Sequence, residues 1–79
     1  SNSLKEDYFM HIITINFEPV ELFKILKFES IVGSGGEAKK RIAEGLVSVN
    51  GEVETRKSRK MMSGDTIEFE KRHYELKLP

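Results

Sequence analysis

The segment from Ser34 to Leu46 constrains the fold most, because it contains the start, the body and the end of one helix. Ser34 and Glu37 have the spacing of a capping box, in which each side chain accepts the backbone N–H of the other residue. Gly45 supplies the left-handed conformation that ends many helices, and Leu46 supplies the hydrophobic contact that often follows. We therefore predict a helix that begins after Ser34 and ends before Gly45.

The two faces of this helix differ in chemistry. Its narrow apolar face, whose small side chains allow close packing on another helix, consists of Ala38, Ile42 and Ala43. Lys40 and Arg41 fall on the solvent side, and Lys39 lies at the border between the faces. The helix should therefore pack through one side and present positive charge on the other.

Two elements precede this helix. The alternation of apolar and polar side chains in residues 11–17 predicts a strand. The apolar side chains on one face of that strand are Ile13, Ile15 and Phe17. Residues 19–28 repeat apolar side chains at helical spacing, and Pro19 suits the first position of a helix because that position needs no N–H. We expect a short helix there.

Asn50 and Gly51 lie between two short valine-containing segments and predict a hairpin over residues 47–54. A two-residue turn would pair each valine of the first strand with a glutamate of the second, which mixes valines and carboxylates on one face. A loop of odd length, with Gly51 at a bulge, would set Val53 beside a valine instead. We expect the odd loop.

Two further alternating segments, residues 66–70 and 74–78, predict a second hairpin. The order strand, helix, helix, hairpin, hairpin predicts an α+β domain in which two helices pack on a small antiparallel sheet of hairpins. A chain of 79 residues has room for one such core. We expect a single domain at residues 10–79. Residues 1–9 are expected to be a tag remnant or a disordered start, because the first three resemble a cloning remnant.

The composition argues against catalysis and metal binding. The absence of cysteine excludes disulfides, thiolate metal sites and cysteine nucleophiles. His11 and His73 lie far apart in strand patterns, and no group of His, Asp and Glu has the spacing of metal ligands. We therefore expect no enzyme activity, no metal and no cofactor. No apolar run approaches the ~20 residues that span a bilayer. We expect a protein that is cytoplasmic and monomeric.

The net charge of zero hides an uneven distribution of charge. Residues 38–60 carry seven basic and three acidic side chains, a net of +4, whereas residues 1–37 have a net of −3 and residues 61–79 a net of −1. Because attraction to phosphate depends on local potential, a locally basic surface on a neutral protein is typical of nucleic-acid binding. A solvated charged face is the alternative.

Two stretches are candidates for phosphate contact. Residues 33–36 are rich in glycine and open the second helix, where free N–H groups and the positive dipole end favour an anion. Their alternative interpretation is a tight turn with a cap. Residues 55–60 contain four basic side chains and no acid, and form either a phosphate track or a flexible solvated loop. The aromatic residues mostly occupy core-like positions and form no platform for stacking bases, which favours structured RNA recognised by shape and backbone.

The ordered combination of these motifs resembles one family. It consists of leucines at 22 and 26, Ser34-x-x-Glu37-Ala38-Lys39, Ile42-x-x-Gly45-x-Val47-x-Val49-Asn50-Gly51, and Gly64-Asp65-x-Ile67. The combination covers residues 19–70 and is similar to the S-four RNA-binding domain, within it to the free-standing bacterial group typified by YbcJ and YaaA. Glu21 and Gly35 stand where many family members carry arginine, a departure that suits the free-standing group.

The resemblance implies an L-shaped motif, formed by the two helices and the following hairpin, that grips structured RNA. It implies ribosomal RNA as the partner and a role in ribosome assembly or association. The candidate RNA-binding residues are Ser34, Gly35, Gly36, Lys39, Lys40, Arg41, Arg56, Lys57, Arg59 and Lys60. Two alternatives stay open. One is an adaptor domain whose basic loop docks an acidic protein, and the other is a targeting domain from a larger RNA-modifying enzyme.

Overall fold

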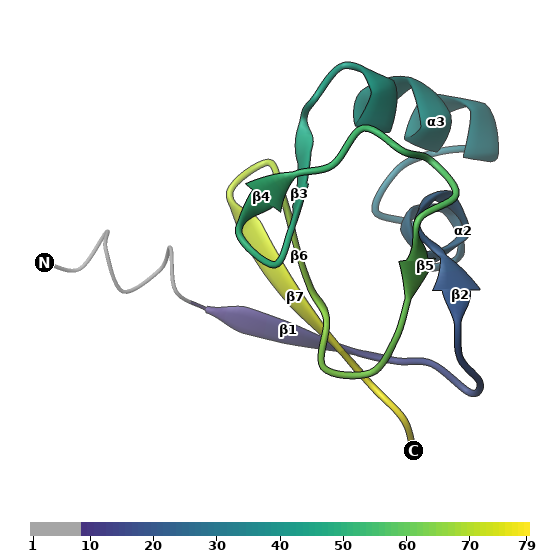
Figure 1. The fold of residues 1–79 in the computed structure, drawn as a ribbon, viewed down its shortest axis with the longest axis vertical. Helices are drawn as coiled ribbons and strands as arrows, with labels where there is room; N and C mark the ends of the chain where they lie inside the picture. Colours follow the sequence, from purple (N-terminus) through teal and green to yellow (C-terminus); the bar gives the residue numbers. More distant parts are fainter. Residues whose placement is uncertain (1–8) are drawn as a thin grey trace, which may run out of the picture.

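The structure, a computed structural model, describes residues 9–79, so the expectation for the first eight residues lies outside the described part. The described residues form two helices and a set of short strands, whose arrangement Figure 1 shows. Their bounds are β1 Met10–Thr14, β2 Val20–Glu21, α2 Leu22–Phe28, α3 Gly35–Ala43, β3 Val47–Val49, β4 Glu52–Val53, β5 Lys60–Met61, β6 Thr66–Phe69 and β7 Arg72–Lys77. The predicted α+β class is confirmed.

The main sheet has five strands in the order β1-β7-β6-β3-β4. The β3–β4, β3–β6 and β6–β7 pairs are antiparallel, as predicted. The β1–β7 pair is parallel, with Ile13 beside Leu76, so the sheet is mixed rather than wholly antiparallel. The sequence pattern could not reveal this difference, because alternation reports the buried face of a strand and not its direction.

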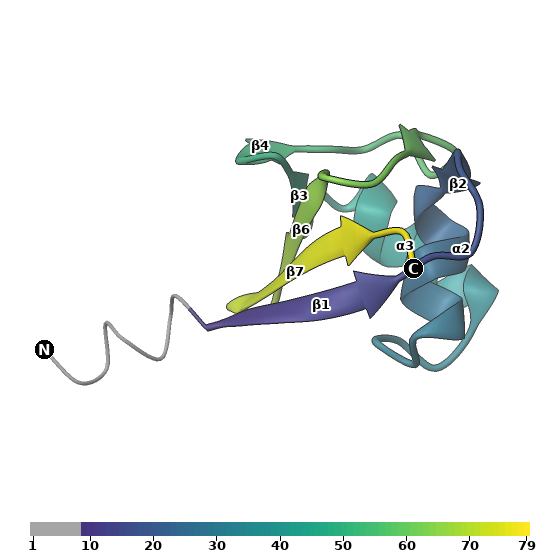
Figure 2. The ribbon, with the colours of Figure 1, turned by 90° about the horizontal axis from the view of Figure 1, so that it is seen from below.

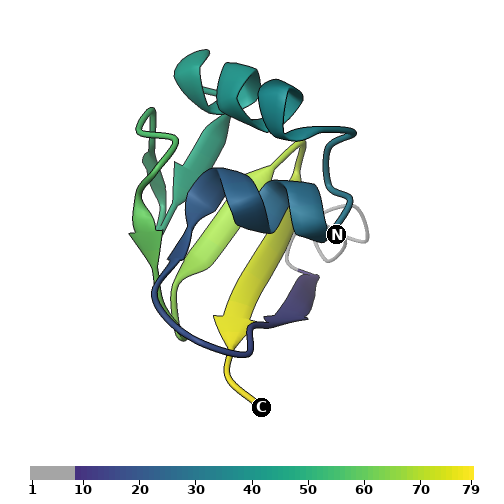
Figure 3. The ribbon, with the colours of Figure 1, turned by 90° about the vertical axis from the view of Figure 1, so that its right-hand side faces the viewer.

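Both helices lie on one side of this sheet (Figures 2 and 3). Side chains from both helices and from the facing side of the sheet form one core. The buried apolar residues are Ile13, Ile15, Val20, Leu22, Ile25, Leu26, Val32, Ala38, Ile42, Val47, Val49, Met61, Ile67, Phe69, Tyr74 and Leu76. No helix within residues 9–79 is both long and apolar enough to cross a bilayer.

The predicted boundaries of α3 are confirmed. The Ser34 hydroxyl accepts the Glu37 N–H at 3.1 Å, and Gly45 has the left-handed φ of 79°. The Gly45 and Leu46 N–H groups donate to carbonyls of the last turn, which is the Schellman arrangement. Two details differ. The Glu37 carboxylate accepts the N–H of Gly33 at 3.2 Å rather than that of Ser34. Ala43 is exposed and does not extend the packed face.

The expectation of an odd hairpin loop is wrong. Val49 pairs with Glu52, so Asn50 and Gly51 form a two-residue turn, and both have positive φ as a type I′ turn requires. The valines of β3 therefore do face glutamates, and Glu54 is buried with only 6% of its surface exposed. Ion pairs to two arginines compensate the buried carboxylate, as described below.

The segment before α2 also differs from expectation. Pro19 precedes the two-residue strand β2 and does not open the helix, which begins at Leu22. Phe17 is 66% exposed although it alternates with Ile13 and Ile15, because β1 ends at Thr14 and the alternation stops there. The aromatic residues are consequently less buried than expected. The exposed phenylalanines are Phe9, Phe17 and Phe28.

Candidate functional site

The N-terminus of α3 presents free backbone donors at an open surface. The Ser34 side chain and carbonyl accept the N–H groups of Glu37 and Ala38. The N–H groups of Gly35 and Gly36 have no acceptor within residues 9–79. A Cβ at Gly36 would meet only the Ser34 Oγ, at 3.9 Å, so the backbone there is unobstructed. Free N–H groups at the positive end of a helix dipole can bind an anion.

The basic loop, defined here as residues 55–60, is held by one carboxylate. The two oxygens of Glu54 accept Nε and Nη2 of Arg56, both at 2.9 Å, and Oε1 also accepts Nη1 of Arg59 at 2.9 Å. The Arg56 N–H donates to the same carboxylate. Bonds from Arg56 and then Arg59 hold the pKa of Glu54 well below its usual range. The pKa of Arg56 is raised in turn by Glu54.

The same loop forms the cap of α2. No side chain caps this helix at Glu21, and its first N–H groups need acceptors. The Leu22 N–H donates to the Arg59 carbonyl at 2.9 Å, and the Phe23 N–H donates to the Lys57 carbonyl at 3.0 Å. β2 pairs with β5 directly beside these bonds. The basic loop is thus fixed on α2 and is not a freely flexible segment.

Phe23 joins the basic loop to α3. Its backbone bonds the loop at Lys57, and Nζ of Lys39 lies 4.7 Å from the centre of its ring. This is within the range of a cation–π contact. The path of the β4–β5 connection past α3 is visible in Figure 1. The two basic stretches of the sequence therefore meet on one surface across Phe23.

The cations on this surface are not equally available. Arg41 lies between two acids, 3.7 Å from Glu37 and 3.4 Å from Glu44. Arg56 and Arg59 bind Glu54, although the Arg56 side chain remains 74% exposed. Four exposed lysines of the predicted site have no ion pair within the described part of the chain, namely Lys39, Lys40, Lys57 and Lys60.

Three residues of this surface were not predicted. A Cβ at Gly35 would lie 3.6 Å from Cδ of Lys27, so this α2 lysine flanks the start of α3. Phe23 and Lys27 are four residues apart and therefore lie on one face of the helix. This spacing could have identified them, but the helix was interpreted only through its apolar residues. Glu54 directly precedes the basic run and was considered only for the register of the hairpin.

The histidines and carboxylates of the described residues form no metal-ligand group. Within residues 9–79, no three His, Asp or Glu side chains lie close enough together to hold a metal ion. His11 and His73 lie on neighbouring strands, β1 and β7, with no acid–base partner defined by a hydrogen bond among the described residues. What the surface offers is backbone donors and ammonium groups, which suit binding of an anionic polymer.

Comparison with known proteins identifies the family. The sequence pattern of the family described as S4 domain matches residues 13–77. The chain belongs to the S4 domain family. This confirms the resemblance that the motifs carried, and the helix pair with its following hairpin corresponds to the L-shaped motif of that family.

Individual relatives agree with this assignment. YbcJ of Escherichia coli (strain K12) is 52% identical over 50 residues, which cover 63% of this chain and 71% of YbcJ. The probable ribosome maturation protein RlbA of Bacillus subtilis (strain 168) is 40% identical over 58 residues, which cover 73% of this chain and 82% of RlbA. The solution structure of YbcJ superposes on this chain with a TM-score of 0.67, over 87% of this chain and 89% of YbcJ. That structure is described as revealing an alpha-L motif involved in RNA binding.

Proposed function

We propose that this chain is a non-catalytic binder of structured RNA, and that its interface joins the N-terminal half of α3 to the basic loop. One observation carries the proposal. Phe23 bonds Lys57 through its backbone and lies under Lys39 through its ring, so the two positive segments form a continuous surface. The relatives support it, because YbcJ is described by a motif involved in RNA binding.

The candidate residues have different roles in this proposal. The exposed lysines, together with Lys27, contact phosphates. The open N–H groups of Gly35 and Gly36 donate to one phosphate oxygen at the helix N-terminus, and Ser34 keeps that terminus formed. Arg56 and Arg59 shape the loop through Glu54 and contribute a weaker direct attraction. Arg41 contributes least, because two carboxylates already neutralise it.

The proposed RNA is ribosomal, and the proposed setting is ribosome maturation in the cytoplasm, where the chain acts as a monomer. The support is the similarity to RlbA, which is named a probable ribosome maturation protein. Sequencing of RNA crosslinked to the protein in cells would identify the target. Enrichment of messenger RNA rather than ribosomal RNA would contradict this part of the proposal and leave RNA binding intact.

The salt dependence of binding tests the RNA proposal itself. A ribosomal stem-loop is titrated with the protein over a series of salt concentrations. Five engaged lysines predict that log K falls with log salt with a slope of roughly −4, since each phosphate contact contributes about 0.7–0.9. An unstructured oligonucleotide of equal length is the control and should bind more weakly. A slope near zero, or no binding at low salt, would overturn the proposal and favour an acidic protein as the partner.

A further inference from the structure

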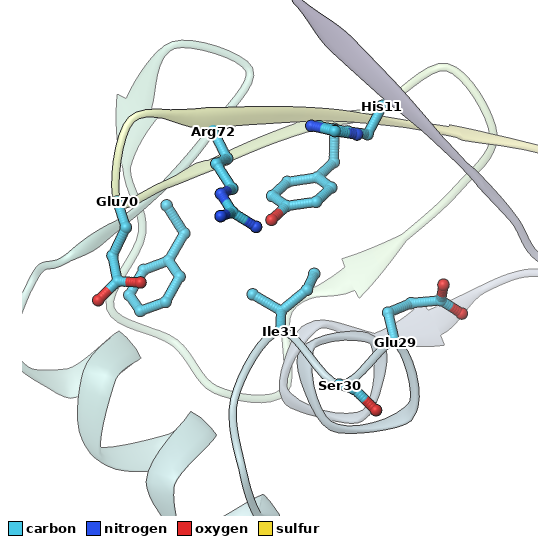
Figure 4. Close-up of a pocket in the computed structure, with 8 residues that line it drawn as sticks. His11, Glu29, Ser30, Ile31, Glu70 and Arg72 are labelled. Atoms are coloured by element: carbon cyan, nitrogen blue, oxygen red, sulfur yellow. The ribbon is translucent and has the colours of Figure 1, made fainter.

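A cavity of about 200 Å³ lies beside the start of the α2–α3 connection, outside the interface proposed above. Residues of three regions line it: His11 on β1, Glu29 to Ile31 after α2, and the β6–β7 hairpin with Phe69, Arg72 and Tyr74. Figure 4 shows the Arg72 guanidinium directed into this space, with Ile31 on the opposite side. The cavity is therefore built jointly by the sheet and the helical layer.

Two hydrogen-bonding groups of the cavity have no partner in the described part of the chain. Within residues 9–79, the Arg72 guanidinium makes no ion pair and no hydrogen bond, and the Tyr74 hydroxyl makes no hydrogen bond. Tyr74 is only 8% exposed. Among residues 9–79, no fully buried side-chain oxygen lacks a partner, so this hydroxyl reaches solvent, and the cavity that Tyr74 lines is its route. The Tyr74 hydroxyl and the guanidinium of the exposed Arg72 are therefore both available to a ligand that enters this cavity.

The lining disfavours a phosphate. Glu29 and Glu70 contribute two negative charges against the one positive charge of Arg72. Ile31 and Phe69 provide apolar walls. The His11 ring stacks behind Tyr74 at 5.5 Å with a tilt of 32°, which supports the aromatic side of the cavity. A neutral, planar ligand with both acceptors and donors matches this environment.

We infer that the cavity binds one unpaired guanine of the RNA. Guanine presents the acceptors O6 and N7 on one edge, which a guanidinium contacts in bidentate fashion. Its N2 amino group is a donor, which a carboxylate such as that of Glu70 accepts. The apolar and aromatic walls receive the faces of the base, as they do in other single-stranded RNA sites.

The position of the cavity fits an RNA held at the α3 N-terminus. Ile31 precedes Ser34 by three residues, so their Cα atoms are at most about 11 Å apart. A nucleotide adjoining one bound at Gly35 and Gly36 can thus place its base in the cavity. The inference rests on the proposed RNA binding, and it adds base selectivity to an interface otherwise made of backbone contacts.

Two measurements test the inference. In the first, the protein binds five versions of one stem-loop, with a single unpaired nucleotide beside the stem that is guanine, adenine, cytosine, uracil or abasic. Guanine should bind about tenfold or more tightly than the abasic site, because a bidentate arginine contact discriminates by that order. Tyr74→Phe and Arg72→Gln should abolish this ratio. Lys71→Gln removes the same charge from the neighbouring residue, which does not line the cavity, and should preserve the ratio.

In the second measurement, guanosine, adenosine and cytidine are titrated separately while NMR signals of the Ile31 methyl groups and the Tyr74 ring are followed. Guanosine should shift these signals most, and Tyr74→Phe should reduce the shift at Ile31. Equal binding of all five stem-loops, or equal nucleoside shifts, would overturn the guanine site and leave RNA binding standing. Failure of every stem-loop would instead overturn the proposed function, and the nucleoside titration would then decide the cavity alone.

Discussion

Glu54 and Arg56 are joined by two parallel hydrogen bonds, Nε to Oε2 and Nη2 to Oε1, both 2.9 Å long. Because the carboxylate is buried and also binds Arg59, it fixes the loop whose carbonyls cap α2. We expect Glu54→Gln to lower the free energy of unfolding by about 1–3 kcal/mol, the usual cost of losing hydrogen bonds to a charged group. Chemical denaturation measures it.

The matched control for that variant is Glu52→Gln. Glu52 is exposed in the same hairpin and has no side-chain partner within the described residues, so its replacement should change stability by less than about 0.5 kcal/mol. Equal effects of the two substitutions would show that the Glu54 ion pairs contribute nothing to the fold.

The same carboxylate predicts a pH dependence. The pKa of Glu54 is lower in the folded protein than its ordinary value of 4.5, so the unfolded state binds the proton more readily. The stabilisation is therefore complete well above pH 4.5 and declines as the pH falls below that value. Thermal unfolding between pH 7 and pH 3 should show a smaller loss for Glu54→Gln than for the unchanged protein. Parallel curves would contradict the assignment.

A substitution at Gly36 can distinguish an effect on RNA binding from an effect on folding. Its φ is not left-handed and its surroundings leave room for a side chain. Gly36→Leu should preserve or raise the melting temperature, because glycine within a helix is unfavourable by roughly 0.5–1 kcal/mol. RNA affinity should fall about tenfold if phosphate approaches the free N–H groups. Ala43→Leu adds bulk at the other end of α3 and should leave affinity unchanged. Equal affinities of the two variants would reject phosphate contact at Gly36.

Charge reversal at one lysine from each segment tests whether the interface is continuous. Lys40→Glu and Lys57→Glu should each weaken RNA binding and reduce the steepness of its salt dependence by about 1. The double variant should reduce the slope of log K against log salt by roughly 2. Lys60 is less suitable, because a glutamate there would face Glu21 across the β2–β5 pair.

Lys77→Glu is the control for these reversals, since Lys77 is the last residue of β7 and the end of that strand lies away from α3 in Figures 1 and 3. It should leave the salt slope unchanged. A loss equal to that of Lys40→Glu would mean that binding follows total charge, without a defined surface.

The features that could be predicted from the sequence are those whose causes are local. The cap at Ser34 and the stop at Gly45 depend on residues within one turn, and both are where the pattern placed them. The hairpin register could not be obtained in this way. Periodicity counts Glu54 as a polar residue for the solvent face, whereas Arg56 and Arg59 stabilise it in a buried position.

The same distinction applies to the candidate site. The lysines were visible as a run of charge, but their meeting across Phe23 depends on how α2, α3 and the basic loop pack in three dimensions. Lys27 was overlooked because its helix was interpreted through its buried side. Arg72 lies between the two predicted strands of the second hairpin and was not a candidate residue, yet the fold brings that turn to the α2–α3 connection.

The parallel pairing of β1 with β7 has a consequence for the order of assembly. During synthesis β1 emerges before the other described strands, but its neighbour in the sheet, β7, emerges after all of them. The helices and the basic loop are linked by shorter stretches of chain, whose closure costs less entropy. The half of the domain that faces RNA can thus form while β1 still has no partner strand. Until β7 pairs with β1, only the helices can bury the apolar residues Ile13 and Ile15.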